Sequence, residues 1–291
     1  MKVKIRIGNE VKEYTGAWED HTLLEVFQEL GITQVHAPCG GNGTCKKCLV
    51  TVEGLGEVLS CQTQCKDDMC VTVAEEQKSA IAENGNCYLY PADAGEGLLA
   101  ACDIGTTTVV CHLLDGATGV RLCTVSAPNA QRSFGADVIS RIQASVDSGL
   151  DKLQSAIVDQ INGMLVQLKQ KAGRTEDIRR LAVAGNTVMS HLFCGLSPES
   201  IGVAPFTPLS LFGESYDAKQ IGIEGCETVY VVPSIAGYVG GDIVADLAAV
   251  QMHSSVLAED GEKETLLLDI GTNGEMVLGK SGSYVCCATA A

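Results

Sequence analysis

The stretch Cys39-Gly-Gly-Asn-Gly-Thr-Cys45-Lys-Lys-Cys48, followed by Leu59-Ser-Cys61, decides the fold of the N-terminal part of the chain. Its cysteines follow the spacing C-x5-C-x2-C-x12-C. Three thiolates lie in one glycine-containing loop whose backbone is free to curl around a small inorganic core, and the fourth comes from a separate segment. This three-plus-one arrangement is typical of a [2Fe–2S] cluster. The predicted ligands are Cys39, Cys45, Cys48 and Cys61.

The spacing within the loop refines this prediction and leaves alternatives. Plant-type ferredoxins have four residues between their first two ligands. Here there are five, so the loop resembles the adrenodoxin-like branch of the [2Fe–2S] ferredoxins. A zinc site is the main alternative, but zinc usually takes paired C-x2-C knuckles and only one is present. A group of disulfides is a further alternative.

The composition argues against several classes of function. The chain has 291 residues, with 36 acidic and 20 basic side chains, a net charge of −16 and a sequence pI of about 4.6. This charge speaks against nucleic acid or an anionic membrane as partner, and it suits steering toward a basic patch on a redox protein. The N-terminus does not resemble a signal peptide, and no apolar run reaches the ~18 residues of a membrane span.

The cysteine content points to a reducing compartment. The chain contains 14 cysteines, of which ten lie outside the cluster motif, most of them within apolar runs and without the spacing of a disulfide framework. Such cysteines usually act as small buried hydrophobic residues. Because free thiols persist in reducing surroundings, we expect a cytoplasmic protein.

The pattern of residues 1–78 predicts an α+β, β-grasp ferredoxin domain. Alternating or apolar segments predict strands at 2–8, 11–15, 49–52 and 69–73. Thr22 and Glu25 form a capping box that opens a helix through Leu30. A charged segment rich in small residues follows, and residues 79–97 are interpreted as a linker.

Two similar segments dominate the rest of the chain. Asp103-Ile-Gly-Thr-Thr and Asp269-Ile-Gly-Thr-Asn each follow an aliphatic strand and precede another. Glycine lets backbone N–H groups approach an anion, threonine hydroxyls add donors, and an aspartate at a strand end suits the water shell of Mg²⁺. The alternative is a pair of ordinary hairpin turns. The candidate residues are Asp103, Gly105, Thr106, Thr107, Asp269, Gly271, Thr272 and Asn273.

The region between the two hairpins alternates strands and helices. An apolar stripe over 139–168 predicts helix, interrupted at Gly149, and strands are expected at 178–184 and 228–233. Residues 196–227 are expected to be irregular. Asp242 follows Gly240 and Gly241 and opens a helix. It is a candidate for orienting an attacking water, with helix capping as the alternative.

The duplicated hairpins resemble phosphate-1 and phosphate-2 of the actin, sugar-kinase and heat-shock-chaperone ATPase superfamily. Three further segments, at 129–141, 184–193 and 202–208, resemble a narrower family, the ATP-dependent reductive activators of corrinoid proteins. In that family the fourth cluster ligand lies in a segment like Leu-Ser-Cys61-Gln-Thr, which favours Cys61 over Cys65 as ligand. The resemblance covers nearly the whole chain.

The resemblance implies a β-grasp domain followed by an α/β, ribonuclease-H-like (actin-like ATPase) domain. Residues 98–260 would form its first lobe and residues 261–291 the beginning of an incomplete second lobe, which another chain could complete in a homodimer. Exposed strand edges and an uncovered apolar sheet face would follow.

The implied function is reactivation of a Co(II) corrinoid to Co(I), coupled to ATP with Mg²⁺. The partners would be a corrinoid protein or methyltransferase and an electron donor, namely a ferredoxin, a flavodoxin or a reductase. Plant-type clusters have potentials near about −400 mV, from which making Co(I) is uphill, so coupled free energy is required. The alternative function is a [2Fe–2S] carrier whose C-terminal region docks a partner without ATPase activity.

Overall fold

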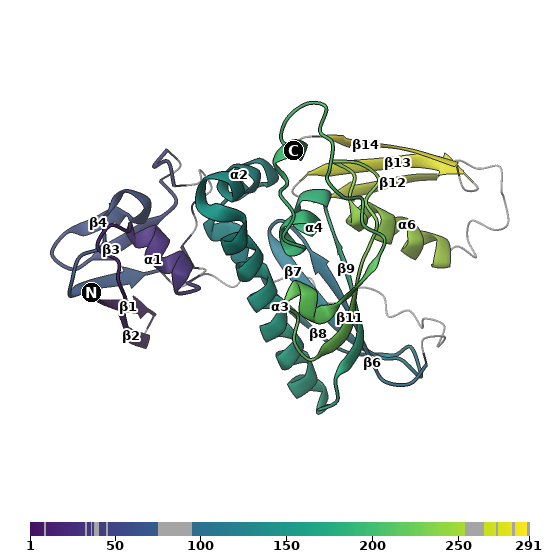
Figure 1. Ribbon diagram of the computed structural model, residues 1–291, viewed down its shortest axis with the longest axis horizontal. Coiled ribbons are helices and arrows are strands. Elements are labelled where there is room, and N and C mark those ends of the chain that lie inside the picture. The colour runs from purple at the N-terminus through teal and green to yellow at the C-terminus, as the bar shows by residue number, and fades with distance from the viewer. Residues whose placement is uncertain are drawn as a thin grey trace. The chain divides into compact units, whose positions relative to one another are not determined.

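A computed structural model describes the fold (Figure 1). The described residues are 1–8, 10–32, 34–35, 37, 41–44, 46–74, 95–253, 265–271, 273–280 and 283–289. They fall into two compact units. The N-terminal unit takes the residues up to 74 together with 130–149, and the C-terminal unit takes 95–129 and the residues from 150 onward.

The N-terminal unit is built on a five-stranded sheet of order β2-β1-β5-β3-β4. Helix α1 (Leu23–Glu29) packs its buried face, which includes Phe27, into the core of this sheet. The predicted capping box is confirmed, since the Glu25 N–H donates to Thr22 Oγ1 and the Thr22 N–H donates to Glu25 Oε2. The strands are β1 (Lys2–Ile7), β2 (Glu10–Thr15), β3 (Leu49–Val52), β4 (Gly56–Leu59) and β5 (Met69–Val73).

This arrangement confirms the β-grasp prediction and adds two elements to it. Strand β1 pairs with β2 in antiparallel fashion and with β5 in parallel fashion, which brings the two ends of the domain together in the middle of the sheet. Strand β4 and the 3-10 turn η1 (Ser60–Gln62) were not predicted. The turn η1 contains Cys61 and fixes its position in the domain.

The predicted helical stripe over 139–168 forms α2, η3 and α3, which follow one another in the chain after a short 3-10 turn. The N-terminal unit contains a 3-10 turn η2 (Ala130–Ser133), helix α2 (Val138–Ala144) and a π-helical turn η3 (Ser145–Gly149). Helix α3 (Leu150–Ala172) continues directly from it in the C-terminal unit. The predicted interruption at Gly149 is therefore confirmed, and its φ of 102° ends the π turn in a conformation that favours glycine.

A six-stranded mixed sheet of order β10-β11-β9-β6-β7-β8 forms the centre of the C-terminal unit. Strands β6, β7 and β8 are antiparallel neighbours, while β9 pairs in parallel with both β6 and β11. This confirms the predicted ribonuclease-H-like fold class. The strands are β6 (Leu98–Ile104), β7 (Thr108–Asp115), β8 (Arg121–Pro128), β9 (Ile178–Gly185), β10 (Ser215–Asp217) and β11 (Cys226–Val231).

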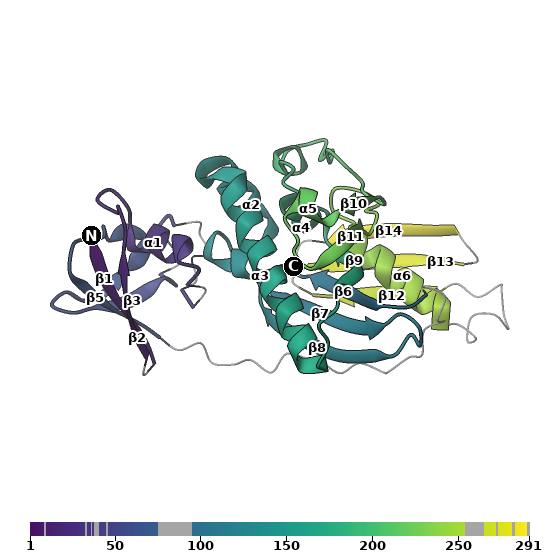
Figure 2. The same cartoon turned by 60° about the horizontal axis from the view of Figure 1, so that its bottom comes forward.

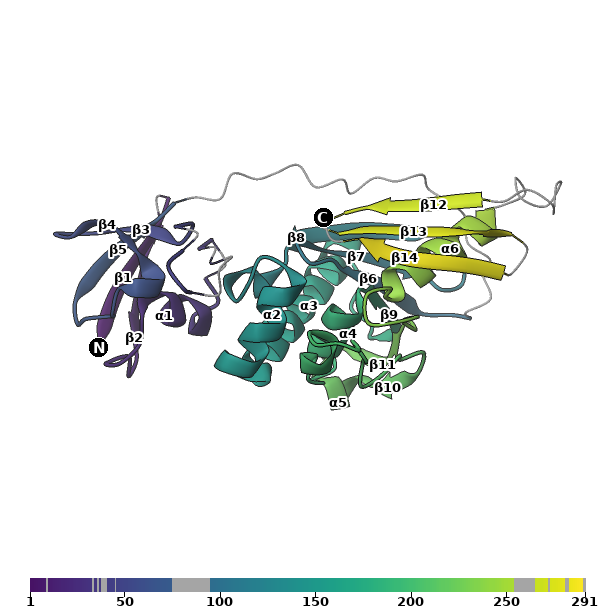
Figure 3. The same cartoon turned by 90° about the horizontal axis from the view of Figure 1, so that it is seen from above.

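Helices cover both faces of this sheet (Figure 2). Helix α3 packs on β7 and β8, and α4 (Thr187–Phe193) packs on α3 and β9. Helix α6 (Gly241–His253) lies on the opposite face and packs against a second, three-stranded sheet (Figure 3). Within the described residues, no helix is both long enough and apolar enough to cross a bilayer.

The second sheet has the order β12-β13-β14, from β12 (Thr265–Ile270), β13 (Gly274–Lys280) and β14 (Ser283–Thr289). Its inner face carries Leu267 and Val277 against α6. On the outer face Leu268 is 50% exposed and Ile270 is 87% exposed. The predicted uncovered apolar face is therefore present among the described residues of this sheet.

The prediction that residues 196–227 are irregular was wrong in part. This segment contains a 3-10 turn η4 (Glu199–Ile201), strand β10, and a short helix α5 (Ala218–Ile221). Asp217 caps α5 by accepting from the Lys219 N–H, and Gly222 ends it with a φ of 91°. These elements are too short for a periodic apolar pattern to reveal them.

Candidate functional site

The cysteine loop and the fourth-ligand segment meet in the N-terminal unit. The Sγ atoms of Cys48 and Cys61 are 3.2 Å apart and both side chains are buried. Gln62 ties the two segments together, because its Nε2 donates to the carbonyl oxygen of Gly41 at 3.0 Å and lies 3.7 Å from Cys61 Sγ. Cys39 and Cys45 lie outside the described residues.

These residues fit a metal cluster. Burial and the neighbouring Cys48 thiol raise the pKa of Cys61 to about 11, so two thiolates at this separation require a cation to hold them. Gly41 and Gly43 have φ of 90° and 73°, which turns the loop tightly beside these thiols. Cys65 is also buried, but Cys61 is the residue that the structure brings to Cys48.

Three glycine-containing turns meet at the carboxyl ends of β6, β9 and β11. The turn after β6 is braced by two asparagines: Asn129 Nδ2 donates to the Gly105 carbonyl oxygen at 2.8 Å, and Asn186 Nδ2 donates to Thr106 Oγ1 at 3.0 Å. Thr106 is buried and Thr107 is exposed. The carboxyl edge of parallel strands is where open α/β sheets place their ligands.

The turn before α6 requires its glycines. A Cβ atom on Gly240 would come within 2.5 Å of the Asn186 Cα, so only glycine allows this backbone to approach the turn after β9. Asp242 then lies in the first turn of α6, where its Oδ1 accepts from the Ile243 N–H at 2.8 Å. An acidic side chain at a helix N-terminus is favourable for the helix dipole.

The second hairpin faces α6 through the inner side of its sheet. Asp269 on β12 pairs directly with Glu275 on β13, next to the pair Leu267 and Val277 that packs on α6. The Gly271 N–H donates to the Asn273 carbonyl oxygen at 3.0 Å, which closes the turn. Thr272 lies outside the described residues.

These elements gather an acidic cluster, defined here as Asp103, Asp242, Asp246, Asp269 and Glu275. Burial, followed by repulsion from Asp242, Asp246 and Asp269, raises the pKa of Asp103 to about 7. Asp103 is itself exposed, so solvent screens part of this effect. Burial and like charges also raise the pKa of Asp246 to about 6 and that of Glu275 to about 7, and burial raises the pKa of Asp242.

Electrostatic repulsion of this kind is relieved by a cation. In the described part of the chain, no three His, Cys, Asp or Glu side chains are close enough to hold a metal ion by themselves. Mg²⁺ commonly keeps several waters and binds through one or two carboxylates plus substrate phosphates. The acidic cluster fits that mode of binding, in which the nucleotide supplies the remaining ligands.

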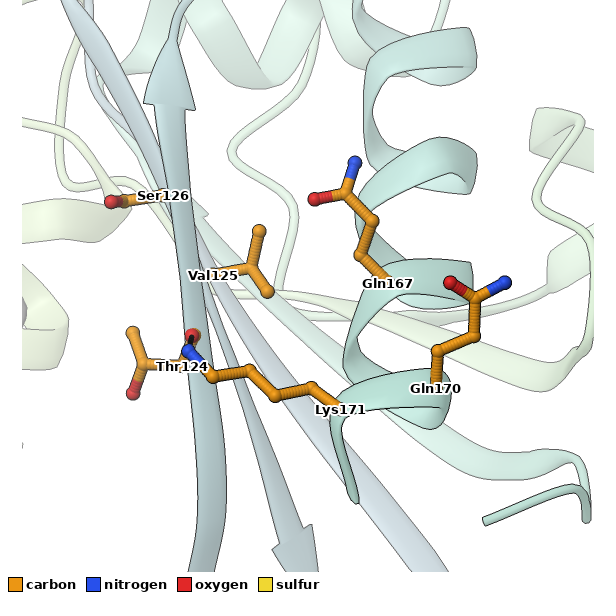
Figure 4. Close-up of a pocket in the computed structure, with 6 residues that line it drawn as sticks. All are labelled: Thr124, Val125, Ser126, Gln167, Gln170 and Lys171. Atoms are coloured by element: carbon orange, nitrogen blue, oxygen red, sulfur yellow. Dashed lines mark hydrogen bonds between the residues drawn. The ribbon is translucent and has the colours of Figure 1, made fainter. Parts of the chain in front are cut away.

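A separate open hollow of about 520 Å³ lies between the edge strand β8 and α3 (Figure 4). Gln167 and Gln170 line it from the helix, and Lys171 Nζ donates to the Thr124 carbonyl oxygen at 2.9 Å. Gln160 Nε2 donates in the same way to Pro128, farther along the strand. These bonds satisfy carbonyl groups of the strand, and the hollow contains none of the predicted site residues.

Comparison with known proteins places this architecture in a family. Residues 98–255 match the model described as the RACo middle region, which is more than half of the chain. The chain belongs to the RACo family. Residues 5–76 match the 2Fe–2S iron–sulfur cluster binding domain. The [2Fe–2S] prediction is thereby confirmed at the level of the domain, and the individual ligands stay predictions.

Two relatives extend the similarity along the chain. The corrinoid activation enzyme RamQ of Eubacterium limosum is 30% identical over 357 aligned positions, which cover 94% of this chain and 58% of RamQ. A solved reductive activator for a corrinoid, iron–sulfur protein is 28% identical with a TM-score of 0.61, covering 99% of this chain and 63% of its own. The chain therefore spans about three fifths of the length of these relatives.

Sequence reasoning missed two members of the acidic cluster. Asp246 lies four residues after Asp242 on α6, a spacing that places both on one helix face. Glu275 follows the second hairpin and lies opposite Asp269 in the strand register. Both signals are present in the sequence, but an acidic residue beside a turn has an ordinary surface interpretation until the strand pairing is known.

Proposed function

We propose that this chain is an iron–sulfur electron-transfer protein that reduces the Co(II) corrinoid of a methyl-transfer protein to Co(I), in a step coupled to ATP. One observation carries the proposal: a single chain joins a 2Fe–2S cluster binding domain to a RACo middle region. The names of both relatives, a corrinoid activation enzyme and a reductive activator, support the same reaction.

In the N-terminal unit, Cys39, Cys45, Cys48 and Cys61 would hold the cluster, which supplies a one-electron carrier when bound. Gln62 keeps the segment of the fourth ligand against the loop through its bond to the Gly41 carbonyl oxygen. The chain would pass one electron per cycle to the corrinoid cobalt, and a ferredoxin, a flavodoxin or a reductase would supply the next electron. The acidic surface of the chain suits a donor with a basic docking patch.

In the C-terminal unit, Gly105, Thr107, Gly271, Thr272 and Asn273 would surround the phosphates of ATP, with Thr106 bracing the first hairpin. Asp103 and Asp269 would bind the waters of Mg²⁺, and Asp242 would orient the attacking water. Because α6 joins Asp242 to the second sheet, occupation of this site would favour one arrangement of the two hairpins.

The test is electron transfer from the anaerobically purified, reduced protein to a purified Co(II) corrinoid protein, followed by the absorbance of Co(I). We expect faster reduction with Mg-ATP than without it. The matched variant Asp103→Asn should lose the ATP effect and keep the cluster spectrum. Equal rates with and without Mg-ATP would favour the alternative of an electron carrier. No Co(I) under either condition would exclude both functions.

The proposed setting is a reducing cytoplasm, without nucleic acid or membrane as partner. The cysteine usage and the net charge of −16 support this setting. A homodimer is the alternative to a monomer, and sedimentation velocity of the reduced protein distinguishes the two.

A further inference from the structure

Within the C-terminal unit, a loop connects η4 to β10 (Figure 2). This apolar loop, residues 202–213, contains no charged side chain, although 56 charged residues are present in the chain. The apolar patch is defined here by five exposed side chains, four from the loop and one from the turn before α6, which is hydrogen-bonded to the loop. The patch consists of Val203 (65% exposed), Phe206 (44%), Leu209 (63%), Leu211 (46%) and Ile235 (45%).

A buried histidine fixes this loop from below. Nδ1 of His191 lies 2.7 Å from the Thr187 carbonyl oxygen, so this nitrogen carries the proton and Nε2 is the acceptor. The N–H groups of Leu209 and Ser210 both donate to Nε2, at 3.2 and 3.3 Å. The ring of Phe212 packs edge-on against the imidazole at 5.0 Å. The loop backbone is thus held in one conformation.

Hydrogen bonds and ring packing also fix the rest of the loop. Ser200 Oγ donates to the Thr207 carbonyl oxygen at 2.6 Å, and the Ser234 N–H donates to the Leu211 carbonyl oxygen at 2.8 Å. The rings of Phe206 and Tyr238 pack edge to face at 5.4 Å. The apolar side chains therefore stay exposed on a rigid frame, which lowers the entropy lost when a partner binds.

The loop has an acidic residue at each end and no charged residue within it. Glu199 and Glu214 flank the loop at its two ends, and both are exposed. Protein interfaces commonly combine an apolar centre with a polar rim. These two glutamates are complementary to a partner surface that has an apolar patch bordered by lysine or arginine.

We propose that the apolar loop is the docking surface for the corrinoid protein that accepts the electron. The partner would present an apolar patch with a basic border. This inference rests on the proposed function, and it gives a role to the segment 202–208, which the site chemistry leaves unused.

The loop is also connected to the nucleotide side of the unit. The turn that carries Ile235 continues into Gly240, Gly241 and Asp242. Thr187 Oγ1 donates to the Ala236 carbonyl oxygen at 2.6 Å, and the backbone of Ala236 pairs with Val239. A change at Asp242 therefore has a short covalent and hydrogen-bonded path to the docking surface, through which ATP could alter affinity for the partner.

The experiment compares Val203→Asp with Val166→Asp. Both positions are exposed valines of the C-terminal unit, at 65% and 51%, but Val166 lies on α3 outside the patch. Binding of each holo variant to a purified Co(II) corrinoid protein is measured by titration calorimetry. We expect about tenfold or greater weakening for Val203→Asp and less than about twofold for Val166→Asp.

A second variant tests the two flanking glutamates and leaves the apolar side chains of the patch unchanged. Glu199→Lys with Glu214→Lys should slow association with the same partner about tenfold at low salt, with the effect fading as salt rises. Equal partner affinity for Val203→Asp, Val166→Asp and the wild type would overturn the inference. The inference would also be overturned if Val203→Asp changed only the sedimentation of the protein, because that would indicate that a second copy covers the patch. A change in thermal stability alone would overturn it too, because that would indicate that the chain itself covers the patch.

The two proposals fail in different ways. If the wild-type protein produces no Co(I), the proposed function is wrong. If it produces Co(I) and the valine variants behave alike, only the docking surface is wrong.

Discussion

Glu275→Gln is the sharpest test of the acidic cluster because the substitution keeps the shape of the side chain. Glu275 is 8% exposed and lies opposite Asp269. Burial and the charges of Asp242 and Asp269 raise its pKa from 4.5 to about 7. At 1.36 kcal/mol per pKa unit, the ionised form costs the folded state about 3.4 kcal/mol.

The cost depends on pH in a definite direction. An acid whose pKa is higher in the folded state imposes no cost below its unfolded value of 4.5. The cost grows as pH rises toward 7 and is constant above that. It is about 1.4 kcal/mol at pH 5.5 and about 3.4 kcal/mol at pH 8.5. These figures are upper bounds, because Glu275 lies close beneath the surface, where water relaxes part of the penalty.

The assay is denaturant unfolding at pH 5.5 and pH 8.5, followed by circular dichroism. Glu275→Gln should raise the free energy of unfolding by about 2 kcal/mol at pH 8.5 and by less than about 1 kcal/mol at pH 5.5. Trp18, the single tryptophan, is buried in the N-terminal unit, so its fluorescence transition should not move. Glu227→Gln, at an exposed position on β11, is the matched control. A gain that is equal at both pH values, or a loss at pH 8.5, would refute the electrostatic reasoning.

Three further predictions concern single contacts. Cys61→Ser should abolish the visible [2Fe–2S] spectrum of anaerobic protein, whereas Cys65→Ser should keep it; the opposite result would reassign the fourth ligand. Asn129→Ala should lower stability by about 1–3 kcal/mol in thermal unfolding, because it leaves the Gly105 carbonyl without its 2.8 Å donor; an unchanged midpoint would contradict this. Gly240→Ala should reduce Mg-ATP affinity with the cluster spectrum intact, because its Cβ would meet the turn at Asn186; normal affinity would show that the turn yields.

Local sequence signals predicted most of the fold. The capping box at Thr22, the alternation in β1 and the duplicated aspartate–glycine hairpins each depend on neighbours within a few residues. Such signals can be interpreted before any tertiary contact is known.

The features that were missed depend on long-range pairing. Asn129 and Asn186 lie in segments that the family resemblance singles out, but their hydrogen bonds to the first hairpin span 24 and 80 residues, and no local pattern predicts those bonds. His191 similarly accepts bonds from residues 18 and 19 positions later. Short elements such as β10 and α5 are decided by their neighbours in the sheet and by a single cap. These positions become informative only once the strand order is fixed.

The energetics of the acidic cluster bear on its function. Five carboxylates from four elements converge there, and burial together with repulsion raises the pKa of Asp103 and Glu275 to about 7. Such an arrangement destabilises the folded protein at neutral pH, and replacing one member by an amide would relieve it. Proteins keep local costs of this kind mainly where a ligand offsets them. A site that binds Mg²⁺ and phosphates supplies that offset only when it is occupied. The stability of the C-terminal unit should therefore rise when Mg-ATP is added, and more so for the wild type than for Glu275→Gln.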